Sequence, residues 1–147
     1  MDAAAAASVE FGVYLNKLFT IDAIFLNEDR HMHNIAVMMN GKGEFDYCPI
    51  FDNGGALLTD TTMDYPLDQD ELLLMKEVHA KTISSDFDEQ LDASEHFYGR
   101  NLRFSFTKKD VERLLAKPEL NMYDMRIRTR VTNIFYQQMN KYKYLFY

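Results

Sequence analysis

Three side chains that can act together on a phosphate lie close to one another in the sequence. Asp29 precedes Asn34 by five positions, and Asp52 follows after a segment with the pattern of a hairpin. In phosphoryl transfer, one carboxylate orients the attacking hydroxyl, while an amide oxygen and a second carboxylate hold magnesium against the phosphates. Magnesium prefers oxygen ligands and usually takes one or two protein carboxylates. The residue types and their order therefore predict a magnesium-dependent phosphoryl-transfer site.

The segment between Asn34 and Asp52 has a sequence that can bring these two residues together. Residues 35–39 alternate as a strand does, and residues 45–51 read as the returning strand. Residues 40–43, Asn-Gly-Lys-Gly, are typical of a tight turn. Antiparallel pairing would put Asn34 at the entry and Asp52 at the exit of one hairpin, within reach of a single metal ion.

These residues resemble the catalytic core of the protein-kinase-like superfamily. The greatest similarity is to HipA-like serine/threonine kinases, whose catalytic loop reads Asp-x-His-x-Lys-Asn. The order Asp-Arg-His-x-x-Asn at residues 29–34 also resembles the loop of phosphoinositide kinases. The specific match covers about residues 20–58, and the rest of the chain is compatible with a helical kinase C-lobe.

The resemblance implies a role for each residue of the motif. Asp29 is expected to be the catalytic base, and His31 is expected to lie near the transferred phosphate. Asn34 and Asp52 are expected to hold Mg²⁺. The residues expected beside bound ATP are Arg30, His33 and Gly54.

Two positions depart from the patterns of these kinases. His33 stands where HipA-like kinases usually carry lysine, so the charge beside the phosphate would depend on pH. Asp52-Asn53-Gly54 replaces the Asp-Phe-Gly of protein kinases, so the phenylalanine that packs behind the metal-binding aspartate is missing.

A nucleotide-binding lid is not recognisable in the sequence. Kinases hold ATP under a small β-rich lobe with a Gly-rich loop and a lysine on a strand. The lysine upstream of Asp29 is Lys17, which falls inside a predicted helix. We therefore expect a separate N-lobe-supplying protein or a homo-oligomer to complete the site. The isolated chain should be a weak or inactive enzyme, and its substrate a protein or small-molecule hydroxyl.

Composition limits the class of protein. The chain has 147 residues, 47% of them hydrophobic and 14% aromatic, which suits one domain with a packed core. Its net charge of −7 argues against general nucleic-acid binding. There is no run of 18 apolar residues and no basic, apolar leader, so we expect no membrane span and a cytoplasmic location. The lone Cys48 suits a reducing compartment as buried filler.

Periodicity and capping residues predict a mainly α-helical fold with one β-hairpin, like a kinase C-lobe. The motif core at about residues 20–58 would be followed by a helical remainder at 59–147. A first helix over residues 11–25 would be capped by Asp2 or Ser8. A second helix is predicted over residues 72–78, capped by Asp68, and a third is capped by Ser85 and ends at Gly99. A fourth helix is capped by Thr107 with Asp110 and ends near Lys117. A last helix starts from about Asn121.

Two other functions are compatible with the sequence. A non-catalytic interaction module would keep the kinase-like fold and use its uncovered face for a partner. A metal-dependent hydrolase would use Asp29, His31, His33 and Asp52, because a His-x-His pair beside aspartate can bind a transition metal.

Overall fold

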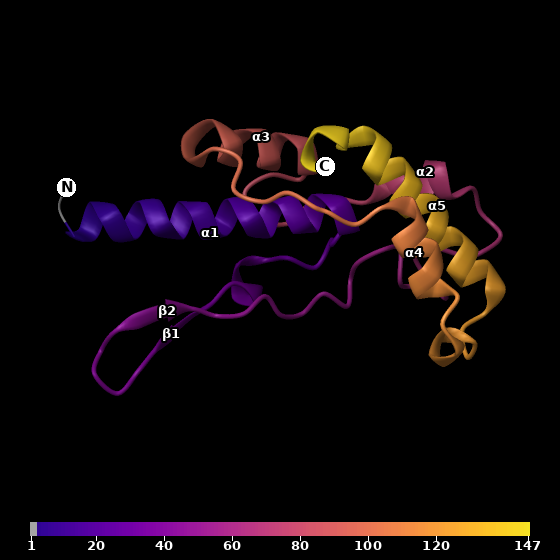
Figure 1. Ribbon diagram of the computed structural model, residues 1–147, viewed down its shortest axis with the longest axis horizontal. Coiled ribbons are helices and arrows are strands. Elements are labelled where there is room, and N and C mark those ends of the chain that lie inside the picture. Colours follow the sequence, from indigo (N-terminus) through magenta and orange to yellow (C-terminus); the bar gives the residue numbers. More distant parts are fainter. Residues whose placement is uncertain (1–2) are drawn as a thin grey trace. The chain divides into compact units, whose positions relative to one another are not determined.

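A computed structural model describes residues 3–147 and is mainly helical, with one two-stranded antiparallel sheet among the described residues (Figure 1). The mainly helical class and the single hairpin are thus confirmed. The helices and strands are α1 (Ala3–Phe25), β1 (Val37–Met39), β2 (Phe45–Tyr47), α2 (Glu71–Glu77), α3 (Phe87–Tyr98), α4 (Lys108–Leu115) and α5 (Met125–Lys141), with 3-10 turns η1 (Met32–Asn34), η2 (Pro118–Leu120) and η3 (Lys143–Leu145).

The chain forms two compact units, each made of two chain segments. Unit 1 contains the chain up to Ala56 together with residues His79–Leu102, and unit 2 contains Leu57–Val78 and Arg103–Tyr147. Nearly all of the motif region predicted at about residues 20–58 lies in unit 1. Every residue proposed from the sequence as catalytic, nucleotide-binding or metal-binding belongs to that unit.

In unit 1, α1 packs along α3 (Figure 1). The two helices approach closely at Gly12, where an added Cβ would lie 2.1 Å from the ring of Tyr98. The fully buried Asn16 fixes the pairing, because its Nδ2 donates to Ser94 Oγ at 3.0 Å and its Oδ1 accepts from the Asn101 backbone N–H at 3.0 Å. A buried amide with donors and acceptors satisfied specifies one register of packing.

The C-terminal end of α1 determines where the motif loop begins. Leu26 has φ of 51°, in the left-handed region, and the Asn27 N–H donates to Asp22 O at 3.0 Å. This is a Schellman-type helix end, with leucine at the position where glycine is usual. The buried side chain of Leu26 helps to hold that conformation.

The hairpin is confirmed, although its strands are shorter than predicted. Val37 pairs with Tyr47, and Met39 pairs with Phe45. Gly43 has φ of 79°, and Asn40 Oδ1 accepts from the backbone N–H groups of Lys42 and Glu44, so the turn forms as the sequence predicts. Tyr47 stacks on Tyr14 of α1, with ring centroids 4.9 Å apart, which anchors β2 to the helix.

In unit 2, α4 packs against α5. The predicted start of α4 is confirmed, since Thr107 and Asp110 form a reciprocal capping box. Buried Arg130 of α5 donates to Tyr65 O and Pro66 O, both at 2.6 Å, and so ties the loop before α2 to α5.

Several predicted helix starts are wrong by a few residues. The cap of α2 is Asp70 rather than Asp68, and the cap of α3 is Asp86 rather than Ser85. Each stretch holds several capping-type residues in a row, and the one chosen depends on how the helix packs. The last helix begins at Met125, after η2, rather than near residue 121. Ser8 lies inside α1, and Asp2 lies outside the described residues.

None of the helices among residues 3–147 combines the length and apolar character that crossing a membrane requires.

Candidate functional site

The motif loop after α1 is folded on itself by local hydrogen bonds. Asn27 Oδ1 accepts from the Asp29 N–H at 3.3 Å, and the Asn34 side chain donates from Nδ2 to Asp29 O at 2.8 Å. The 3-10 turn η1 begins immediately after His31, whose carbonyl accepts from the Asn34 N–H. The spacing of Asp29 and Asn34 thus closes a compact loop in which both residues take part.

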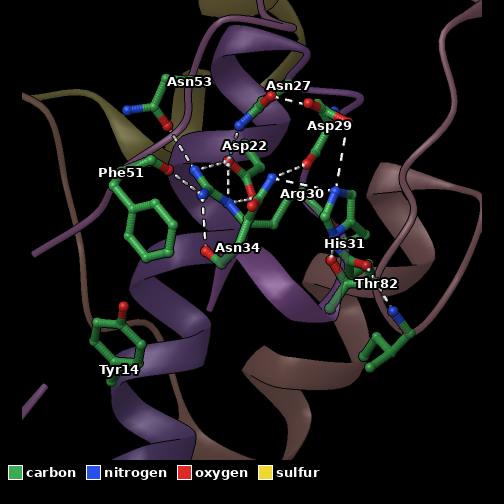
Figure 2. A network of polar contacts seen from close by, with 12 residues as sticks. Tyr14, Asp22, Asn27, Asp29, Arg30, His31, Asn34, Phe51, Asn53 and Thr82 are labelled. Carbon is green, nitrogen blue, oxygen red and sulfur yellow. Dashed lines mark hydrogen bonds and ion pairs between the residues drawn. The ribbon is translucent and has the colours of Figure 1, made fainter. Parts of the chain in front are cut away.

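Arg30 holds this loop to the rest of unit 1 (Figure 2). Its side chain is almost fully buried, and its Nε lies 3.0 Å from Asp22 Oδ2 on α1. Nη1 donates to Asn34 O at 3.2 Å. Thr82, from the segment before α3, donates its hydroxyl to Arg30 O at 2.5 Å. A planar guanidinium with five donors can satisfy several acceptors at once, which lysine cannot do.

The same guanidinium binds the loop that follows the hairpin. Nη1 also donates to Phe51 O and Nη2 to Asn53 Oδ1, each at 2.5 Å. These two acceptors flank Asp52 on both sides. The structure therefore joins the Asp29–Asn34 loop and the Asp52 loop through one buried side chain, called the Arg30 clamp below.

The ion pair at the centre of the clamp is buried on both sides. Asp22 is fully buried, and burial raises the pKa of its carboxyl, although the hydrogen bond and charge of Arg30 and a hydrogen bond from Asn27 act in the opposite direction. Burying a carboxylate is unfavourable unless it is paired and hydrogen-bonded. Asp22 meets this condition through Arg30 and Asn27 together.

Asp29 differs from Asp22 in being open to solvent. Its side chain is 46% exposed, and its Oδ1 lies 3.9 Å from Nε2 of His31. The carboxylate of Asp29 is therefore accessible from solvent, while its backbone is held by the loop. The geometry is compatible with the role of base that the resemblance implies for Asp29.

The two histidines of the motif lie beside each other. The rings of His31 and His33 are 5.6 Å apart in an edge-to-face arrangement. His31 Nε2 also lies 3.4 Å from Asn34 Nδ2, while its Nδ1 is buried without a hydrogen-bond partner. His33 is exposed to solvent, as a residue that meets a nucleotide should be.

Asn34 and Asp52 have features that suit magnesium ligands. Because Nδ2 of Asn34 is engaged with Asp29 O, its amide oxygen is the atom left for a cation. Asp52 is exposed and has φ of 54°, a conformation that aspartate tolerates better than most residues. Non-glycine residues held in such conformations are concentrated at functional sites. Hard oxygen atoms from an amide and a carboxylate fit Mg²⁺.

The structure changes one sequence-based assignment, that of Arg30. Arg30 was expected beside ATP, but its buried guanidinium is occupied by Asp22 and three loop acceptors, so we assign it a positioning role. The role of Gly54 beside a nucleotide stays a prediction. At the neighbouring Gly55, a Cβ would lie 2.7 Å from Asp29 Cβ. Gly55 is therefore the residue that allows the two loops to meet, and its carbonyl accepts from the Glu28 N–H.

Sequence reasoning missed the residues that support the motif. Asp22, Asn27, Asn53 and Thr82 all hydrogen-bond to the loop or to Arg30. One signal was available for Asp22, because a charged residue amid the apolar stripe of α1 needs a buried partner. No comparable signal marked Thr82, which lies 52 residues from Arg30.

Among the described residues, no three His, Cys, Asp or Glu side chains gather as a metal-binding cluster. Asp29, His31, His33 and Asp52, the residues considered for a metal-dependent hydrolase, are thus not gathered as such a cluster. A magnesium site built on one amide and one carboxylate is of a different kind.

Comparisons with known proteins give no match: none of the protein-family models fits the chain, and searches of curated proteins and of solved structures find no significant similarity.

Proposed function

We propose that unit 1 is the catalytic and metal-binding core of a kinase-like phosphotransferase of the HipA-like type, which transfers a phosphoryl group from ATP to a hydroxyl with Mg²⁺. The observation that carries the proposal is the Arg30 clamp. It holds Asp29 and Asn34 in one loop and Asp52 in another through a single guanidinium. Phosphoryl transfer depends mainly on positioning and electrostatics, so hydrogen bonds that fix the two loops carrying these residues would serve it.

The proposed roles are those that the resemblance implies, and exposure and hydrogen bonding support them. Asp29, half-exposed and beside His31, would accept or orient the proton of the substrate hydroxyl. Asn34 and Asp52 would hold Mg²⁺, which would neutralise charge on the phosphates. His33, which is exposed, would face the nucleotide.

The charge of the site supports the need for a separate lid. The positive charge of Arg30 is compensated by Asp22 inside unit 1 and is shielded from a bound nucleotide. Charge on the phosphates must then be met by Mg²⁺ and by groups outside the clamp. We infer that a second protein or a second copy of the chain supplies them, and that the chain alone is a poor kinase.

Paramagnetic Mn²⁺, which takes the same oxygen ligands as Mg²⁺, provides a direct test. In an amide NMR spectrum of the full chain, low concentrations of Mn²⁺ should broaden residues 29–34 and 51–55 first, and excess Mg²⁺ should reverse the effect. Asp52→Asn should abolish this pattern. Asp46→Asn on β2 is a matched control, because its carboxylate is exposed and outside the clamp.

Two results would count against the proposal. One is broadening that begins in another acidic stretch, such as residues 86–92, and spares the two loops. The other is an unchanged pattern in Asp52→Asn.

A non-catalytic interaction module is the second candidate, and the exposure of the hairpin favours it. Both strands present large apolar side chains to solvent, with Met39 65% and Phe45 73% exposed. Contiguous exposed apolar surface marks interaction sites. If this function is the correct one, Met39→Lys with Phe45→Lys should abolish association, measured by sedimentation velocity, and Mn²⁺ should not select the two loops. Leu114→Lys in α4, where leucine is 54% exposed, is the matched control.

A further inference from the structure

Unit 2 contains an apolar pocket that the phosphoryl-transfer proposal does not use. Its volume is about 360 Å³, within the usual range for small-molecule sites. Its walls come from the loop after Ala56, the end of α4, η2 and the first half of α5. The aliphatic lining includes Leu57, Leu115, Leu120, Ile127 and Val131.

Two arginines of α5, Arg128 and Arg130, interrupt this apolar wall. Arg128 donates from Nη1 to the neutral Asn121 Oδ1 at 3.2 Å, and Arg130 donates to two backbone carbonyls. None of these three acceptors is a carboxylate. Burial lowers the pKa of the Arg130 guanidinium, with Glu71 and Asp68 opposing the effect. The pocket wall thus holds positive charge whose hydrogen-bond partners are neutral.

One atom of Arg128 makes this arrangement unusual. Its Nε is buried and has no hydrogen-bond partner, one of two such side-chain atoms among the described residues. Buried donors are rarely left unpaired, because the loss of hydration is not compensated. The Nε edge of a guanidinium is also one that can take part in bidentate binding of a carboxylate.

We propose that this pocket binds a small amphipathic carboxylate, with its alkyl tail among the leucines and its head group on Arg128. The tail would replace water on an aliphatic surface, and the head would pair with Nε and the adjacent Nη2. Because Nε is covered in the structure, the Arg128 side chain must turn toward the pocket as the ligand enters. The chain's net negative charge would not draw in such a ligand, so affinity must come from local charge and apolar contact.

Calorimetry with decanoate, 1-decanol and acetate tests the contribution of the carboxylate head group separately from that of the alkyl tail. Decanoate should bind to the full chain saturably and at least about tenfold more tightly than 1-decanol, because the neutral hydroxyl cannot form the charge-assisted pair with Nε and Nη2. Acetate should bind too weakly to measure, since it lacks the tail. In an NMR titration, decanoate should shift the methyl signals of Leu115, Leu120 and Ile127.

Variants of α5 test the role of Arg128. Arg128→Gln should remove the preference for decanoate over 1-decanol, and Arg128→Lys should retain part of it. Arg126→Gln is the matched control, because Arg126 is exposed on the same helix and pairs with Asp124 at 2.8 Å. Arg130 is left unchanged, since it ties the loop before α2 to α5.

Equal binding of decanoate and 1-decanol would overturn the proposal, as would an unchanged preference in an Arg128→Gln protein with normal circular dichroism. Methyl shifts confined to residues outside the pocket would also overturn it. None of these readouts depends on phosphotransferase activity, so the pocket and the unit 1 site can fail independently.

Discussion

Arg30 in unit 1 and Arg130 in unit 2 are both buried, and both hold a loop to a helix. Arg30 pairs with a buried carboxylate, Asp22, and uses its other donors for two loops. Arg130 has backbone carbonyls as its hydrogen-bond partners, those of Tyr65 and Pro66. Arg30 thus combines a buried ion pair with hydrogen bonds to two loops, whereas Arg130 makes hydrogen bonds to neutral acceptors only.

The two arginines should therefore differ in how much stability is lost when each is removed. Removing Arg30 would leave a buried carboxylate that has lost its counter-charge, whereas removing Arg130 would take one donor from each of two neutral carbonyl groups. The first defect is far more unfavourable, because an unpaired buried ion loses much more hydration energy than a neutral acceptor. The candidate catalytic loops are therefore tied to an interaction that is more sensitive to substitution than the one Arg130 makes in unit 2.

The largest effect is expected for Arg30→Met. Loss of the guanidinium should lower the free energy of unfolding by about 3–5 kcal/mol, the range for breaking a buried ion pair from one side. Urea denaturation followed by circular dichroism measures it. A loss below about 1 kcal/mol, the level of an exposed ion pair, would contradict the burial of the pair.

The double variant Asp22→Leu with Arg30→Met separates charge from positioning. Replacing both partners by apolar residues should recover much of the lost stability. The Mn²⁺ broadening of residues 29–34 and 51–55 should still be lost, because the two loops are no longer joined. Recovery of both properties would show that the Arg30 clamp is not what positions the site.

The next largest effect concerns the two exposed carboxylates of the site. Asp52→Ala should weaken Mg²⁺-dependent ATP binding about tenfold or more, since even supporting residues of metal sites contribute 10–100-fold to affinity. Asp29→Ala should largely preserve binding and remove turnover measured with a lid protein present. Calorimetry and a phosphate-transfer assay distinguish the two. Robust turnover by the isolated chain that Asp29→Ala leaves intact would refute the role of Asp29.

A smaller loss is expected for Arg130→Met in unit 2. The carbonyls of Tyr65 and Pro66 would lose their donor, at a cost of about 1–3 kcal/mol for an unsatisfied buried acceptor. The urea midpoint should therefore fall less than in Arg30→Met. An equal or larger fall in the urea midpoint would show that Arg130 pairs in charge with Glu71 and Asp68. Both arginines would then contribute through ion pairs.

The features that sequence predicted correctly are those decided by near neighbours. The turn at Asn40 and Gly43 and the capping box of Thr107 and Asp110 need only residues a few positions apart. The role of Arg30 was missed because it depends on how α1 ends at Leu26, which brings Asp22 and the loop together. The close approach of Gly55 to Asp29 could not be predicted either, because it depends on how the two loops meet in space.

The caps of helices in the two units should have similar and modest effects. Thr107→Ala before α4 and Asp86→Ala before α3 each remove a side chain that accepts from backbone N–H groups at the helix start. The substitution of Thr107 should cost about 1 kcal/mol. If the urea midpoint of the Thr107→Ala protein matches that of the wild type, the capping box contributes nothing to the free energy of unfolding.

The smallest effect is a contrast in pH dependence between the two units. The Thr107 backbone N–H and hydroxyl lower the pKa of Asp110, so its contribution is present above about pH 3.8 and is lost as pH falls through its folded pKa. Burial raises the pKa of Asp22, so its contribution to stability falls as pH rises from about 3.8 through the folded value. The free energy of unfolding can be measured in urea at several values between about pH 2.5 and 6. Its rise with pH due to Asp110 should be missing in Asp110→Asn, and its fall with pH due to Asp22 should be missing in Asp22→Asn. If the contribution of Asp22 to stability instead increased with pH, as that of Asp110 does, then the effect of Arg30 on the pKa of Asp22 would be larger than the effect of burial. The ion pair in the Arg30 clamp would then be net stabilising.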